Sequence, residues 1–239
     1  MRHAFAVLAL GLALATPQSR ASPETEMIAD LLKETQFQGG DGATQRLVWW
    51  SPTDFWVLTA RQAPGASELQ IQQVAKLLDR YVMVAVMEGT IGPLGGMTFT
   101  AEDALRGSVR LIDGQGRAVE TLEADAIDSD TQNFLAMMKP MLSKMLGPFG
   151  ANVHFVLFPA TTKSGARYAD PRSESIFHVE LSGERFTYRL PLGALLPRKV
   201  CPKDGERLNG AWKYCPRHGV ELTGEEARGA AQPRSNLMP

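Results

Sequence analysis

Apolar residues at helical spacing mark three segments of the chain. The first follows Ser22-Pro23 and ends before Gly39-Gly40, the second covers residues 67–80, and the third covers residues 129–147. In each segment apolar side chains recur every three or four positions, which places them on one face of a helix. We expect Ser129 or Asp130 to cap the third helix, and four of its apolar residues are methionines. We expect all three faces to pack against a core.

Shorter apolar runs predict strands between these helices. Residues 46–50 look extended, and Ser51-Pro52 then introduces a short helix that carries Trp56. Residues 81–87 are apolar at every position except the tyrosine, which predicts a central strand covered on both faces. Further strands are expected at residues 97–99, 108–112, 118–122 and 153–157, and Asp113-Gly114-Gln115-Gly116 has the composition of a hairpin loop.

The clearest predicted hairpin lies between residues 177 and 190. Phe177, Val179 and Leu181 share one face of the first strand, and Phe186, Tyr188 and Leu190 share one face of the second. A loop through Ser182-Gly183-Glu184-Arg185 sets Leu181 opposite Phe186. That register places His178 across from Arg189 and Glu180 across from Thr187. The result is a polar row, which is typical of a solvated outer face.

Helices and hairpins follow one another without a regular strand-helix-strand repeat. This order favours an α+β fold with a largely antiparallel sheet and packed helices. We expect one main domain at residues 24–198, a small hairpin at 199–223 and a flexible tail at 224–239.

The first 21 residues have the pattern of a secretory signal peptide. Arg2 and His3 precede an apolar run of about a dozen residues, and a small-x-small end follows at Ser19-Arg20-Ala21. The run is shorter than the roughly 20 residues of a membrane-spanning helix, and no later run is long enough. The sequence therefore predicts a soluble bacterial protein that is exported to the periplasm or secreted, with no integral membrane segment after cleavage.

Charge excludes one class of partner. The chain has 25 basic and 26 acidic residues, and cleavage after residue 21 removes only Arg2 and Arg20, which leaves a net charge of −3. The basic residues are scattered singly instead of clustered in a stripe that would neutralise phosphates. We expect no nucleic-acid binding.

One short pattern occurs twice near the C-terminus: Cys201-Pro202-Lys203-Asp204-Gly205 and Cys215-Pro216-Arg217-His218-Gly219. The doubled pattern resembles a zinc ribbon, a family in which each knuckle reads C-P-x-C-G. Here the second ligand position is Asp in one copy and His in the other. Carboxylate oxygen and imidazole nitrogen also bind zinc, so the resemblance implies a ligand set of Cys201, Asp204, Cys215 and His218. With four protein ligands the zinc would be structural, and we expect no other cofactor.

Two other states of the same residues compete with the metal. Paired knuckles bring their first cysteines close together, and an oxidising compartment favours a disulfide from Cys201 to Cys215. Alternatively, the segment is a degenerate ribbon with free thiols and no metal. We also expect Leu208, Trp212 and Tyr214 to bury the apolar side of the hairpin.

The sequence carries no familiar catalytic motif. It lacks the G-x-S-x-G elbow, the H-E-x-x-H zinc motif, the phosphate-binding loop and the dinucleotide fingerprint. The leading hypothesis is a binding or interaction protein with an unidentified protein or small-molecule partner and a stapled C-terminal ribbon. The alternative is an exported hydrolase or metal-dependent enzyme, for which His154 and His178 are the best candidate residues.

Overall fold

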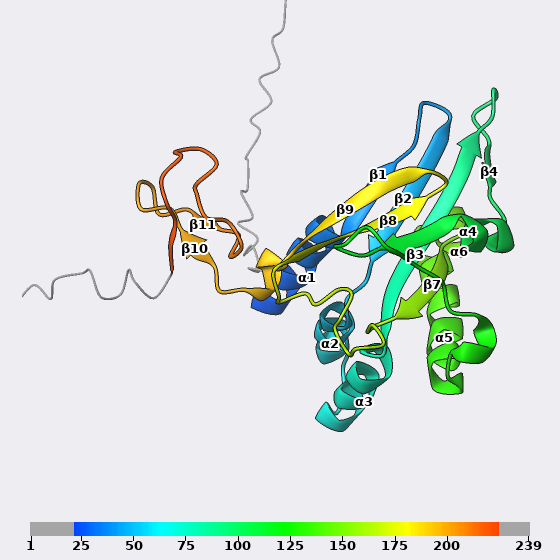
Figure 1. Cartoon of the computed structure of the whole chain (residues 1–239), viewed down its shortest axis with the longest axis horizontal. Coiled ribbons are helices and arrows are strands. Elements are labelled where there is room, and N and C mark those ends of the chain that lie inside the picture. The colour runs from blue at the N-terminus through cyan, green and yellow to red at the C-terminus, as the bar shows by residue number, and fades with distance from the viewer. Residues whose placement is uncertain (1–21, 225–239) are drawn as a thin grey trace, which may run out of the picture.

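A computed structural model describes residues 22–224 (Figure 1). The expected signal peptide at 1–21 and all but the first residue of the expected tail lie outside these residues. The helices are α1 (Pro23–Thr35), α2 (Thr53–Gln62), α3 (Glu68–Leu78), α4 (Glu102–Ser108), α5 (Ser129–Leu146) and α6 (Pro148–Ala151), with short 3-10 turns η1 (Ala124–Ala126) and η2 (Gly193–Leu195). Within this part of the chain no helix is long and apolar enough to cross a membrane.

The first sheet is built around one long strand, β3 (Tyr81–Ile91). One edge of β3 pairs with β2 (Thr44–Trp50), which in turn pairs with β1 (Gln36–Gly39). The opposite edge is shared by β7 (His154–Pro159) along its first half and by β4 (Met97–Phe99) near its end. All these pairings are antiparallel. The strand predicted at 81–87 is thus confirmed as the central strand, whereas the four-residue β1 has too little pattern to be predicted.

The second sheet has the order β6 (Ala118–Val119), β5 (Val109–Ile112), β8 (Ser175–Leu181) and β9 (Glu184–Leu190), again antiparallel. The predicted register of the last hairpin is wrong by two residues, because Val179 pairs with Phe186 and His178 pairs with Thr187. A two-residue turn replaces the expected four-residue loop. Ser182 and Gly183 both have positive φ, 50° and 83°, as a tight primed hairpin turn requires.

Two apolar layers hold the main domain together. One lies between the sheets, where Val48, Trp50 and Val84 meet Phe177 and Tyr188. The other lies between the far face of the first sheet and the helices, and it contains Trp49, Trp56, Met83, Leu157, Phe134 and Leu135. The central strand is therefore buried on both faces, and Trp49, Trp50 and Trp56 belong to the core. This arrangement of helices and antiparallel sheets confirms the α+β fold.

The helix boundaries follow local capping chemistry. Ser67 and Gln70 form a reciprocal capping box at the start of α3. α5 begins at Ser129 as expected, but its cap is Asp128 instead of Ser129 or Asp130, because the carboxylate of Asp128 accepts the N–H of Thr131. The α5 methionines do not all pack into the core as expected: Met137 is 69% exposed and Met141 is 43% exposed.

The C-terminal hairpin forms a small unit of its own beside α1 (Figure 1). Its strands are β10 (Lys199–Val200), β11 (Arg207–Leu208) and β12 (Thr223–Gly224), with β10 in the middle. Gly224 pairs with Lys199, so the hairpin includes the residue expected to open the tail. Leu208 and Leu222 are buried with the two cysteines, whereas Trp212 and Tyr214 are exposed, against expectation.

Candidate metal centre

The two repeats of the C-terminal pattern adopt the same backbone turn. In the first, the N–H of Gly205 donates to the carbonyl of Cys201 (2.8 Å), and the N–H of Cys201 donates to the carbonyl of Glu206 (3.0 Å). In the second, Gly219 donates to Cys215 (2.8 Å), and Cys215 donates to Val220 (2.8 Å). Both glycines have positive φ, which a residue with a Cβ rarely adopts. Repeated sequence therefore gives repeated geometry.

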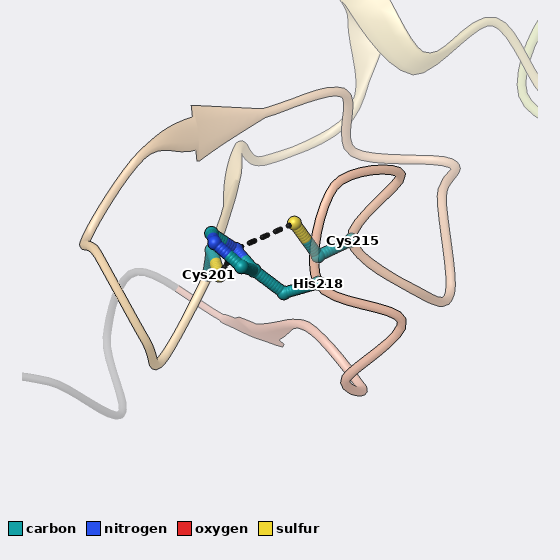
Figure 2. Close-up of side chains that lie close together, drawn as sticks. All are labelled: Cys201, Cys215 and His218. Carbon is teal, nitrogen blue, oxygen red and sulfur yellow. Dashed lines mark hydrogen bonds between the residues drawn. The ribbon is translucent and has the colours of Figure 1, made fainter.

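The turns bring three side chains to one point. The ligand atoms of Cys201, Cys215 and His218 all lie within 4.8 Å of one another (Figure 2). The two cysteines are buried, and the imidazole is 31% exposed. Nδ1 of His218 lies 3.3 Å from Sγ of Cys201 and 3.5 Å from Sγ of Cys215. These three residues could hold a metal ion.

The spacing of these atoms fits a tetrahedral ion. Zinc binds sulfur at about 2.3 Å and imidazole nitrogen at about 2.0 Å, so a tetrahedral angle separates the two donors by roughly 3.5 Å. The two observed S···N distances, 3.3 and 3.5 Å, are close to that value. Nδ1 is thus the imidazole atom placed for coordination. The two cysteines are not at disulfide distance in this structure.

Asp204, the fourth residue of the expected ligand set, lies at the margin of this group. Its Oδ2 atom is 3.7 Å from Nδ1 of His218, but it does not belong to the set of atoms that are mutually within 4.8 Å. Its carboxylate also accepts the backbone N–H of Glu206 (3.0 Å). The structure thus gathers three of the expected residues closely and places the fourth outside their group.

Burial and backbone dipoles act in opposite directions on the ionisation of Cys201 and Asp204. Burial raises the pKa of the Cys201 thiol above its usual value, although the backbone N–H groups of Asp204 and Lys203 act to lower it. The N–H of Glu206 and the neighbouring thiol of Cys201 lower the pKa of Asp204. A cation would favour the charged form of every one of these groups, because the ion replaces the solvation lost on burial.

A carboxylate on α1 attaches the hairpin to the main domain. Glu34 accepts the N–H groups of Gly193 and Ala194 at 2.8 Å each, and the side chain of Asn209 donates to it at 3.1 Å. An ion pair between Arg198 and Asp30 lies beside it. These contacts join residues about 160 positions apart in the sequence, and no sequence pattern predicts them.

The histidines named for an enzymatic function have separate surroundings. Nδ1 of His154 lies 2.9 Å from the carboxylate of Glu102, and Nδ1 of His178 lies 2.9 Å from the hydroxyl of Thr187. Glu180 pairs with Arg185 instead of lying across from Thr187. The polar row on the second sheet therefore consists of cross-strand pairs. Within residues 22–224, His154 and His178 contact different partners and do not form one site.

No protein-family model, curated protein or solved structure matches this chain.

Proposed function

We propose that the chain is an exported binding protein whose C-terminal ribbon is held by one structural zinc ion. Cys201, Cys215 and His218 supply three ligands, and Asp204 rotates to supply the fourth. The convergence of the first three ligand atoms within 4.8 Å is the observation that carries the proposal. Export rests on the signal-like pattern of residues 1–21 and periplasmic or secreted localisation follows from it.

The size of the hairpin supports a structural role for the ion. Its buried apolar cluster contains only Leu208 and Leu222 besides the two cysteines, with Val220 partly buried against them. So small a core cannot stabilise an independent fold, and small domains commonly rely on a metal or a disulfide instead. A closed set of four protein ligands leaves no position for a substrate.

The ligand types support zinc above harder cations. Thiolate and imidazole are the donors that zinc prefers, whereas magnesium and calcium require oxygen ligands. Zinc also keeps two thiolates apart in an oxidising compartment, where free neighbouring thiols would otherwise pair. We therefore propose that the Cys201–Cys215 disulfide forms only in protein that lacks the metal.

Substitution of each ligand tests the proposal, with cobalt(II) as a spectroscopic probe of the ligand set. We expect one cobalt per chain, with sulfur-to-metal charge-transfer bands and the intense d–d bands of a tetrahedral ion. Cys201→Ser should weaken the charge-transfer band, and His218→Ala should abolish stoichiometric binding. Asp204→Asn should lower the affinity for cobalt by at least about tenfold, since even the loss of a residue that only hydrogen-bonds to a metal ligand costs that much.

Lys203→Ala is the matched control, because its exposed side chain lies in the same turn beside Asp204. It should bind cobalt like the unchanged protein. Octahedral spectra without charge-transfer bands, or an unaltered spectrum in His218→Ala, would refute the assignment.

A further inference from the structure

A second candidate site lies under α5, far along the chain from the metal centre. It is a cavity of about 210 Å³ between α5, the start of β7 and the segment around η1. Ile127, Leu135, Val153 and Phe155 form apolar walls. Pockets for drug-sized molecules measure about 300–1,000 Å³, so this cavity suits a smaller organic molecule.

One end of the cavity is charged. Glu102 lies there with Oε2 2.9 Å from Nδ1 of His154 and 3.4 Å from Nζ of Lys139, and with Oε1 3.8 Å from Nε of Arg106. One carboxylate thus faces two permanent cations and an imidazole, which leaves a net positive charge at this end. Ammonium offers three N–H donors and guanidinium five, so a single carboxylate cannot satisfy them.

The imidazole is fixed by its neighbour. Burial raises the pKa of Glu102, but the charges of His154 and Lys139 outweigh it, and the pKa is lowered overall. The ionised carboxylate of Glu102 accepts a hydrogen bond from the Nδ1–H group of His154. This bond orients the ring of the buried histidine. The imidazole at this end of the cavity is therefore oriented before any ligand arrives.

The edge of β7 adds backbone groups to the same cavity. The carbonyl of Leu157 accepts the N–H of Leu122 (2.8 Å), so it points away from β3. In an antiparallel ladder every second residue has the same orientation, and Phe155 shares that of Leu157. Its N–H and carbonyl thus lie on the outer edge of β7, at the wall of the cavity.

We propose that this cavity binds a small aliphatic carboxylic acid. Its carboxylate pairs with Lys139 and Arg106, and its hydrocarbon part packs against Leu135, Val153 and Phe155. A cationic ligand would face two like charges, and an inorganic anion would leave the apolar walls unfilled. The proposal gives a ligand class to the binding role proposed above, and it uses no residue of the metal centre.

Titration of the full mature chain, with its metal bound, tests this inference by calorimetry and amide NMR. The probes are acetate, butyrate and hexanoate, with hexanamide, hexylamine and inorganic phosphate as comparisons. We expect saturable binding that tightens roughly fourfold for each added methylene, as burial of a CH₂ group predicts. Shifts should centre on Val153 and Phe155, and hexanamide should bind about tenfold more weakly for want of a charge.

A matched pair of variants on α5 locates the charge. Lys139→Met should weaken hexanoate binding about tenfold, whereas Lys144→Met, which removes an exposed lysine outside the cavity, should leave it unchanged. Equal effects of the two variants, affinity independent of chain length, equally tight binding of hexylamine or phosphate, or no saturable binding would overturn the proposal. Metal content is measured on the same samples, so that a failure of the acid-binding proposal can be distinguished from a failure of the zinc proposal.

Discussion

At the scale of single residues, carboxylates organise loops that apolar packing leaves unsupported. Asp113 begins the turn between β5 and β6, and its side chain is 8% exposed. It accepts the N–H groups of Gln115 and Arg117 at 2.9 Å each and the guanidinium of Arg117 at 2.8 Å. Glu34 acts in the same way on the two N–H groups at η2. In both places one carboxylate satisfies backbone donors that would otherwise be unpaired.

Asp113→Asn should lower stability in a pH-dependent way. Burial opposes ionisation of Asp113, but the backbone N–H and guanidinium of Arg117 prevail, so the pKa of this carboxyl is lowered in the folded protein. A carboxyl whose pKa is lowered by folding stabilises the protein fully at pH values above its pKa in the unfolded chain, near 4. This stabilisation is lost as the pH falls through the pKa of the folded protein. We expect a loss of about 1–3 kcal/mol at pH 7 in urea unfolding, and a smaller difference below about pH 4.

Asp125→Asn is the control for this measurement, because Asp125 is exposed. It should change stability by less than about 0.5 kcal/mol. A difference between the Asp113 variant and the unchanged protein that stays constant from pH 7 to pH 3 would contradict the assigned role.

At the scale of elements, most helices and strands follow from the sequence, but the pairings depend on turns. Residues 67–80 and 81–87 were predictable because period, caps and burial agree there. The register of β8 with β9 was not predictable. The two-residue turn places Ser182 at positive φ, which is unusual for serine, so the sequence did not indicate this turn. Shifting a hairpin by two residues keeps every side chain on its face, so the apolar pattern could not reveal the error.

Gly183→Ala should weaken the β8–β9 hairpin through backbone strain alone. A Cβ at Gly183 would meet nothing within 4 Å, but its φ is +83°. The left-handed region costs an alanine about 1–2 kcal/mol, which we expect as the loss of unfolding free energy. Gly42→Ala is the matched control, since a Cβ there also meets nothing and the φ is not positive. Equal stabilities of the two variants would contradict the tight turn.

At the scale of the whole molecule, residues 22–224 form a layered main domain and a hairpin with little core of its own. The doubled pattern allowed the sequence to identify Cys201, Cys215 and His218 as neighbours, because each turn is local and repeats. It could not predict the attachment through Glu34, nor the cavity beside Glu102, because both join residues from distant parts of the chain. Only the folded arrangement places them together.

The central claim is that the hairpin is held by one zinc ion. The most direct test is the intact mass of the purified mature protein, measured natively and after denaturation, with metal analysis of the same sample. We predict that the native mass exceeds the chain mass by one zinc, and that denaturation releases the ion and leaves two free thiols. A chain two hydrogens lighter, without metal, would establish the Cys201–Cys215 disulfide and contradict the account.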